Sequence, residues 1–312
     1  MKTPRHYGIA PGRVRRWPRL LSRWLCGLVI VIGVPLYFAV ELSSSAYTAS
    51  SPLSVLARLY EQPSPLRWPA AHRGDAAFGH ENSLPAIRGP AQAGVPLIEV
   101  DVRRNVDGTL FLFHDRHFDP ERVIAPSELI GRHVESLHDH ELRLIRYRAT
   151  IAAPPATYAE ALEAVKSYRT ALLLDVRGES VAVIDQAVRI ARAKGQSHQI
   201  VIQCQSLSTL ARVRVRYPDI AVVARLHAIA DLRLAYRKLP DIIQIDADWI
   251  TPEVVQEIHA VGSKILVKSL YGMDTAKDWD RLFDAGIDIL LTDRAVQMVR
   301  HLRAPQRSHD MP

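Results

Sequence analysis

Short apolar runs that alternate with helix-like segments dominate the chain between residues 68 and 292. Nine such runs cover residues 68–72, 97–102, 110–114, 171–176, 200–205, 220–226, 242–246, 264–269 and 287–292. Apolar runs separated by helical segments are typical of parallel βα units, in which helices cover the sheet. The alternation therefore predicts an α/β fold.

The spacing of the second and third runs removes one of the nine from the parallel set. Asp107-Gly108, a strong tight-turn dipeptide, lies between them. A crossover between parallel neighbours needs about a dozen residues, so 110–114 is predicted to be the return strand of a hairpin. The eight remaining strands predict a (β/α)8 TIM barrel, with a small hairpin after the second strand and a polar insertion, 116–159, that acts as a lid or specificity element. An open doubly wound sheet is the alternative, but no glycine-rich dinucleotide fingerprint follows any run.

The N-terminus carries the features of a membrane anchor. Residues 24–40 contain no charge, and the run is bounded by Arg23 and Glu41. A membrane-spanning helix needs about 20 apolar residues, and the basic residues before this run place the N-terminus in the cytoplasm. We expect a basic cytoplasmic segment at 1–23, a single transmembrane helix at 24–41, a linker at 42–66, a barrel domain outside the cytoplasm at 67–300 and a C-terminal tail at 301–312. Secretion after cleavage before Tyr47 is the alternative.

The charge balance excludes a nucleic-acid-binding protein. The chain has 40 Lys+Arg against 33 Asp+Glu, a net charge of +7. Seven basic residues precede the first acid, Glu41, and account for the whole excess. The rest of the chain is neutral, so no basic surface for DNA or RNA is expected. Two cysteines likewise exclude a zinc site built on cysteines.

Carboxylates gather at the carboxyl ends of the predicted strands, where barrels of this kind carry their reactive groups. Glu99 and Asp101 are two residues apart on one strand and therefore share a face. Two buried like charges are costly unless a cation holds them. Asp175 ends another strand and can supply a third carboxylate. Oxygen ligands of this kind favour Ca²⁺ or Mg²⁺ over zinc.

Histidines and arginines complete the set of polar strand ends. His72 and His114 end two further runs, a pattern that suits one general base and one general acid. Arg73 and Arg177 offer guanidinium groups that match phosphate oxygens. A hard cation, a histidine pair and arginine donors together predict the hydrolysis of a phosphate ester.

Residues 71–115 carry most of these groups in a recognisable order. The order is His72-Arg73-Gly74, Glu81-Asn82-Ser83, Glu99-Val100-Asp101, Asp107-Gly108 and His114-Asp115. It resembles the signature of the glycerophosphodiester phosphodiesterase family, and a weaker similarity extends over residues 67–295. The resemblance implies a metal-dependent barrel that hydrolyses glycerophosphodiesters to glycerol 3-phosphate and an alcohol. It also implies that His72 and His114 are the catalytic pair, that Glu99 and Asp101 bind the metal, and that Arg73 contacts the phosphate.

Three positions depart from the family pattern, and a fourth, Glu81, has two possible roles. Asp175 stands where the family usually has a metal-binding Glu, and Arg177 where it usually has Lys. Aspartate at the first of these positions resembles the related sphingomyelinase D-like barrels. Lys268 lies in a run where the family usually has Trp-Thr-Val. Glu81 is either a further metal ligand or only part of the turn that begins the next helix.

Three functions are compatible with these residues. The first is a membrane-anchored phosphodiesterase that acts on glycerophosphodiesters. The second is a lysophospholipase D-like or sphingomyelinase D-like enzyme that acts on lysolipids, which a membrane anchor also suits. The third is a barrel with a decayed metal site, used as a binding module. The presence of both histidines together with Glu99 and Asp101 argues against the third, because a decayed site has no reason to keep costly polar groups together.

Overall fold

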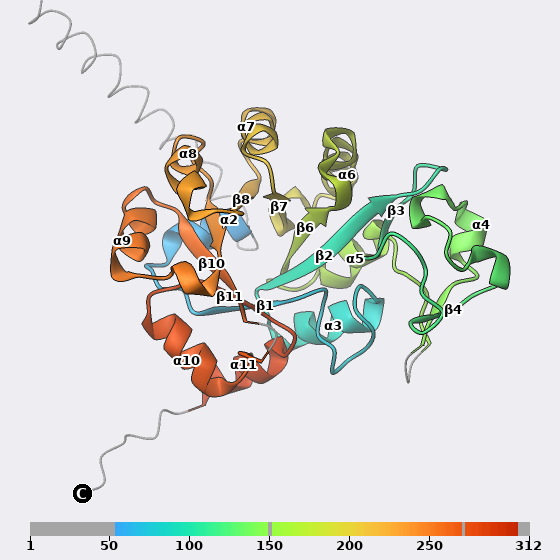
Figure 1. Ribbon diagram of the computed structural model, residues 1–312, viewed down its shortest axis with the longest axis horizontal. Helices are drawn as coiled ribbons and strands as arrows, with labels where there is room; N and C mark the ends of the chain where they lie inside the picture. The colour runs from blue at the N-terminus through green and yellow to red at the C-terminus, as the bar shows by residue number, and fades with distance from the viewer. Residues whose placement is uncertain (1–53, 149–151, 270–271, 305–312) are drawn as a thin grey trace, which may run out of the picture. The chain divides into compact units, whose positions relative to one another are not determined.

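Eight parallel strands form a closed barrel in the computed structural model, which describes residues 54–148, 152–269 and 272–304 (Figure 1). In order around the barrel they are β1 (Trp68–Ala71), β2 (Leu97–Arg104), β6 (Ala171–Val176), β7 (Ile200–Cys204), β8 (Ala221–Arg225), β9 (Ile242–Ile245), β10 (Lys264–Ser269) and β11 (Ile289–Thr292). β1 pairs with both β11 and β2, which closes the sheet. The predicted (β/α)8 barrel is confirmed.

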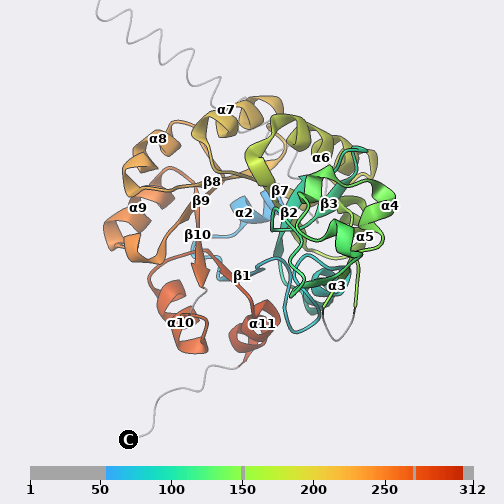
Figure 2. The ribbon, with the colours of Figure 1, turned by 45° about the vertical axis from the view of Figure 1, so that its right-hand side comes forward.

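One helix follows each barrel strand, and these helices surround the barrel (Figure 2). They are α3 (Leu84–Ala93), α5 (Tyr158–Val165), α6 (Val181–Ala193), α7 (Leu207–Arg216), α8 (Leu232–Tyr236), α9 (Pro252–Ala260), α10 (Ala276–Asp284) and α11 (Ala295–Arg303). Several begin at a residue whose side chain satisfies a free backbone N–H. Thr157 and Glu160 form such a capping box at the start of α5.

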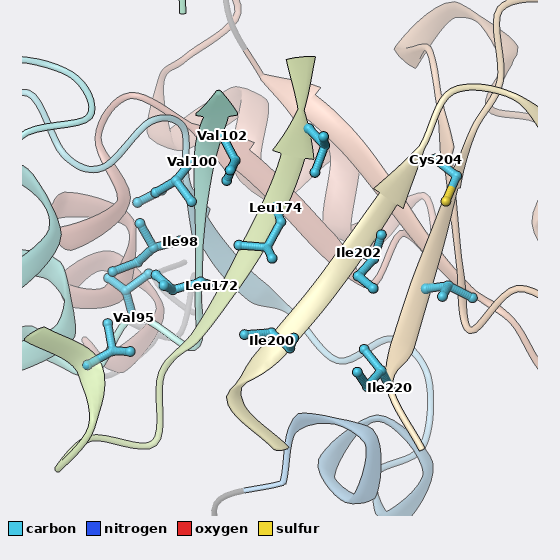
Figure 3. Close-up of a cluster of buried hydrophobic side chains, with 14 of the residues drawn as sticks. Val95, Ile98, Val100, Val102, Leu172, Leu174, Ile200, Ile202, Cys204 and Ile220 are labelled. Atoms are coloured by element: carbon cyan, nitrogen blue, oxygen red, sulfur yellow. The ribbon is translucent and has the colours of Figure 1, made fainter. Parts of the chain in front are cut away.

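The side chains of each strand alternate between the helices and the barrel interior. On β2 and β6, Ile98 and Leu172 belong to the cluster that packs against the helices (Figure 3). Leu97 points the opposite way, into a second cluster inside the barrel. Because the alternation has a period of two, Glu99 and Asp101 continue the inward row of Leu97. The strand pattern thus places both carboxylates inside the mouth of the barrel.

A hairpin and a small insertion interrupt the crossover between β2 and β6. Their elements are β3 (Leu110–Leu112), β4 (Val123–Ile124), α4 (Asp139–Leu142) and β5 (Arg146–Tyr147). β3 pairs antiparallel with the end of β2, which confirms the return strand predicted at 110–114. Phe111, Phe118 and Tyr147 are buried in a hydrophobic cluster that belongs to this segment. The polar insertion is therefore a packed element rather than an open loop.

A helix, α2 (Val55–Glu61), lies in the segment 42–66 that we predicted to be a linker. Val55 and Leu59 are buried among the side chains at the beginning of the barrel strands. Figure 2 shows α2 in the middle of the ring of helices. At seven residues, α2 is too short to show a helical period in the sequence. The barrel domain therefore begins before the predicted boundary at residue 67.

The structure can be compared with the segment predicted at the C-terminus but not with those predicted at the N-terminus. At the C-terminus, α11 continues to Arg303, so the tail predicted from residue 301 begins too early. His301 is fixed within the fold, with its Nε2 2.9 Å from Asp280 Oδ1. The transmembrane helix expected at 24–41 and the basic segment at 1–23 lie outside the described residues. Within residues 54–148, 152–269 and 272–304, no helix combines the length and apolar character needed to cross a bilayer.

Pro90 lies inside α3 and leaves one backbone carbonyl of this helix free to bind the loop that follows β1. A proline lacks the N–H that would bond to the carbonyl four residues earlier, here that of Ala86. The Ala86 oxygen instead accepts a hydrogen bond from the Asp75 N–H at 2.9 Å. Gly74 makes this approach possible, because a Cβ there would lie 2.5 Å from the same oxygen. The proline thus frees an acceptor that fixes the loop after β1.

Replacing Gly89 with alanine is expected to destabilise the fold by about 1–3 kcal/mol, because small-to-large changes in packed sites carry a cost of that size. A Cβ at Gly89 would lie 2.2 Å from the ring of Phe78. Urea unfolding measures the change. In a Phe78→Ala background the same substitution should cost nothing, since the overlapping ring is gone. Equal destabilisation in both backgrounds would show that Phe78 is not the cause.

Candidate active site

Three carboxylates from two neighbouring strands meet inside the mouth of the barrel. Glu99 and Asp101 extend from β2, and Asp175 extends from β6 directly beside Asp101 in the sheet register. All three side chains are buried, and their ligand-type oxygen atoms lie within 4.8 Å of one another. The structure therefore brings together the three residues that we predicted to bind a metal.

Burial within this carboxylate cluster disfavours the charged forms of Glu99 and Asp101. Burial is the largest cause that raises the pKa of Glu99 well above its ordinary value, and the charges of Asp101 and Asp175 raise it further. Burial also raises the pKa of Asp101, although the Arg73 charge and a hydrogen bond from Asn82 oppose it. Repulsion among buried carboxylates is relieved when a cation binds between them.

One oxygen of the cluster is free to bind such a cation. Asp101 Oδ1 is buried and accepts no hydrogen bond from the described residues. The nearby Arg177 Nη1 lies 3.6 Å from it, beyond hydrogen-bonding distance. Buried polar atoms without a partner are rare in folded proteins. Three carboxylates without sulfur form an oxygen donor set that suits Ca²⁺ or Mg²⁺. The residues present therefore fit a divalent cation of this kind.

The loop that follows β1 and the turn before α3 position the cluster. Asn82 Nδ2 donates to Asp101 Oδ2 at 2.8 Å, and the Asp101 N–H donates to Asn82 Oδ1 at 3.0 Å. Asn82 has a φ of +59°, a left-handed conformation that asparagine tolerates better than most residues. The Arg73 N–H donates to Glu99 Oε2 at 2.9 Å. Asn82 was part of the predicted motif, but its role in holding Asp101 was not predicted.

Glu81 is not part of the carboxylate cluster. Its Oε2 accepts a hydrogen bond from Arg73 Nη1 at 3.0 Å, and its Oε1 lies 2.7 Å from Arg122 Nη2. Ser83, two residues later, is the N-cap of α3. The structure thus places Glu81 between two arginines at the start of a helix, and it orients the Arg73 guanidinium toward the site.

Each predicted catalytic histidine is paired with an aspartate. His72 Nδ1 lies 2.8 Å from Asp293 Oδ1, and His114 Nδ1 lies 2.7 Å from Asp115 Oδ1. The hydrogen bond with His72 is the largest cause that lowers the pKa of Asp293. Burial opposes a lower pKa at Asp115, but the hydrogen bond with His114 and the Arg122 charge outweigh it. Because each Nδ1 has a carboxylate partner, Nε2 is the nitrogen left for chemistry.

These aspartates were not predicted to orient the histidines. Asp115 follows His114 directly in the sequence, and their contact is local. Asp293 and His72 are 221 residues apart in the chain and meet because β1 pairs with β11. The polar ends of those two strands were visible in the sequence. Their pairing follows only from closure of the barrel.

Two further side chains hold Asp175. Arg177 Nη1 donates to Asp175 Oδ2 at 2.9 Å, and Gln205 Nε2 donates to Asp175 Oδ1 at 3.1 Å. Arg73, the other predicted phosphate-binding residue, has its Nε 3.5 Å from Asp101 Oδ2. Both arginines therefore border the cluster. Lys268 extends from β10 into the same region, where burial lowers its pKa and the Glu99 charge opposes that effect.

The chain is similar to phosphodiesterases in both sequence and structure. Residues 72–297 match the Glycerophosphoryl diester phosphodiesterase family. A curated relative from Mycobacterium tuberculosis, named "Probable glycerophosphodiester phosphodiesterase 2", is 26% identical over 243 residues, which are 72% of this chain and 86% of the relative.

Two solved structures share the fold at low sequence identity. A glycerophosphoryl diester phosphodiesterase from Parabacteroides distasonis has a TM-score of 0.66 at 17% identity, covering 81% of this chain and 92% of that one. An Oleispira antarctica phosphodiesterase in complex with the product sn-glycerol-3-phosphate has a TM-score of 0.63 at 19% identity. The match covers 76% of this chain and 97% of that one.

Proposed function

The chain belongs to the glycerophosphoryl diester phosphodiesterase family, and on that basis we propose that a divalent cation and a histidine pair carry out its reaction. The protein is a phosphoric diester hydrolase, and glycerophosphodiesters are its substrate class. The proposed products are glycerol 3-phosphate, which occupies the related Oleispira antarctica enzyme, and the alcohol of the substrate.

The buried carboxylate cluster is the observation that carries this proposal. Glu99, Asp101 and Asp175 would hold Ca²⁺ or Mg²⁺, with the unpartnered Asp101 Oδ1 as one ligand. A divalent cation at such a site supplies Lewis-acid stabilisation of charge on phosphate oxygens. Arg73 and Arg177 flank the cluster and would bind the phosphate of the substrate through their guanidinium groups.

The two histidines would exchange protons with the reacting oxygens. One of His72 and His114 accepts a proton from the attacking group, and the other donates one to the leaving alcohol. Asp293 and Asp115 fix the ring of each histidine by binding Nδ1. Each histidine therefore has the partner that acid–base chemistry requires.

The membrane anchor remains part of the proposal. Its support is the uncharged run at 24–40 with basic residues before it, which would place the barrel outside the cytoplasm. An alkaline phosphatase domain fused after residue 312 tests the orientation. Alkaline phosphatase activity of the fusion in intact cells agrees with a barrel outside the cytoplasm. Phosphatase activity that is seen only after lysis contradicts this orientation.

A substrate panel tests the proposed reaction. Purified full-length protein is assayed with glycerophosphocholine, lysophosphatidylcholine and sphingomyelin in the presence of Ca²⁺ or Mg²⁺. We expect cleavage of glycerophosphocholine, measured as glycerol 3-phosphate, at a rate at least about tenfold above that of either lipid, as expected for a site that receives glycerol without an acyl chain. Faster cleavage of lysophosphatidylcholine would make the protein a lysophospholipase D-like enzyme instead.

A further inference from the structure

A cavity of about 360 Å³ lies beside the active site, and four arginines contribute to its lining. Its polar lining includes four arginines and one carboxylate, together with a histidine: Arg103, Arg104, Arg116, Arg177, Glu135 and His133. We call it the arginine pocket. It lies between the end of β2, the segment after β6 and the insertion that follows β3. Its size is within the range of small-ligand sites, which begins at about 300 Å³.

The single carboxylate in the arginine pocket is already paired. Arg103 donates from Nη1 to Glu135 Oε1 at 2.9 Å, from Nε to the Phe113 carbonyl at 2.9 Å and from Nη2 to the His114 carbonyl at 2.6 Å. Each of the three guanidinium nitrogens of Arg103 therefore donates to a protein acceptor. Arg103 and Glu135 form a wall of the pocket and contribute no free charge to it.

The other arginines retain unused donors. Within the described residues, Arg104 and Arg116 form no ion pair with any carboxylate. Arg177 uses Nη1 for Asp175 and has its other nitrogens free of ion pairs in the same part of the chain. Guanidinium groups that converge on one cavity repel one another and attract anions when the lining carboxylate, here Glu135, is already paired. The arginine pocket is thus built to receive negative charge.

The backbone around the pocket is held in place. The Val134 N–H donates to the Arg116 carbonyl at 2.8 Å, and His117 and His133 form an antiparallel bridge. Arg104 is the last residue of β2 and is fixed by the pairing of that strand with β3. Secondary structure therefore sets the positions from which these arginines extend.

Arg177 joins the arginine pocket to the carboxylate cluster. Its Nη1 contacts Asp175, while the residue also lines the pocket. Arg103 adds a second connection, because it binds the carbonyl of His114. A substrate whose phosphate lies against Arg177 could therefore extend its alcohol portion into the pocket.

We propose that the arginine pocket binds a second anionic group, a phosphate or a carboxylate, carried by the alcohol portion of the substrate. This proposal rests on the proposed function and adds to it a preference, among glycerophosphodiesters, for those of anionic alcohols. Arg104, Arg116 and the free side of Arg177 provide the recognition. The arginines offer no favourable contact to a positively charged choline, so glycerophosphocholine is expected to bind more weakly than a substrate with an anionic alcohol.

The test uses two compounds that differ by one phosphate group, glycerophosphoinositol and glycerophosphoinositol 4-phosphate. Their dissociation constants are measured by calorimetry on full-length His72→Ala protein, which prevents turnover, at fixed Mg²⁺. We expect the phosphorylated compound to bind about tenfold more tightly, a modest value for charge-assisted bonds to partly exposed arginines. Arg104→Gln combined with Arg116→Gln should bring the ratio of the two dissociation constants close to one.

A matched pair of substitutions controls for overall charge. Arg212 on α7 and Arg237 after α8 are exposed and lie outside the arginine pocket. Arg212→Gln combined with Arg237→Gln removes the same charge and should leave the ratio near ten, as in the parent protein. A ratio that falls equally in both double variants would assign the preference to general attraction, and the proposal would be wrong.

Two further results would also overturn the proposal. One is a ratio near one in the parent protein. The other is binding of inorganic phosphate in the pocket together with no gain in substrate affinity from the 4-phosphate. The pocket would then bind a free anion rather than part of the substrate. A separate assay of the His72-containing enzyme on both compounds distinguishes these failures from failure of the proposed function. Absence of turnover with a retained binding ratio would reject the reaction but not the pocket.

Discussion

Substitution of His72 by alanine is expected to reduce kcat by about 10²–10⁴-fold, the usual contribution of a general acid or base. His72 directly follows β1, and Asp293 holds its ring through Nδ1, which leaves Nε2 as the proton-transferring atom. Alanine removes that atom and leaves the Asp293 carboxylate without its partner. Steady-state assay of glycerol 3-phosphate release with glycerophosphocholine measures the effect.

His301 provides a matched control for this substitution. It is also a histidine paired with an aspartate, at 2.9 Å from Asp280, but it lies on α11 and on none of the strand ends. His301→Ala should leave kcat within about twofold of the parent value, as surface changes away from the site usually do. The backbone N–H of His72 bonds to the Thr292 carbonyl in either case, so the barrel of His72→Ala should stay closed. A well-folded His72→Ala protein with parental kcat would contradict the proposed role.

Substitution of Glu99 by glutamine is expected to abolish metal-dependent activity and, at the same time, to stabilise the metal-free protein. Burial and two neighbouring carboxylates raise the pKa of Glu99, so its charged form is disfavoured in the folded state. Glutamine keeps an oxygen that can accept the Arg73 N–H and removes the charge. Stabilisation of about 1–2 kcal/mol is typical when a strained functional residue is replaced.

The pH dependence of this stabilisation has a definite sign. A carboxyl group whose pKa is raised by folding binds more protons in the folded state than in the unfolded state. Stability then falls as the pH rises above the ordinary glutamate value of 4.5, and this loss is absent in Glu99→Gln. The difference in Tm between variant and parent, measured in chelator, should therefore grow from acidic to neutral pH.

Metal addition separates this explanation from a general effect of charge removal. Mg²⁺ or Ca²⁺ should raise the Tm of the parent protein and leave that of Glu99→Gln unchanged. Glu128→Gln, at an exposed glutamate of the insertion, should respond to the metal as the parent does. If the metal raised the Tm of Glu99→Gln as much as it raises that of the parent protein, the cation would bind elsewhere.

The strands were predictable because their periodicity is local. The alternation along β2 fixes which side chains point inward, and so it predicted that Glu99 and Asp101 share the barrel interior. The same reasoning identified β3 as a return strand, since a tight turn leaves no room for a crossover. Barrel architecture then placed Asp175 and His72 at one end, and the antiparallel return strand brings His114 back to the level of Asp101.

Features that depend on tertiary contacts were not predictable in this way. Helix α2 is stabilised by the barrel interior rather than by its own seven residues. The direction of Glu81 depends on Arg122, which reaches it from the insertion. The partner of His72 required closure of β1 against β11, and the arginine pocket required the fold of the insertion. Each of these arises from segments that are far apart in the sequence.

The metal dependence of turnover tests the central claim most directly. Full-length protein is stripped of metal with chelator, and glycerol 3-phosphate release from glycerophosphocholine is followed as Ca²⁺ or Mg²⁺ is returned. The buried carboxylates of Glu99, Asp101 and Asp175 predict no turnover in chelator and saturable recovery with one of the two cations. Undiminished turnover in chelator by the metal-free enzyme would contradict this account of the site.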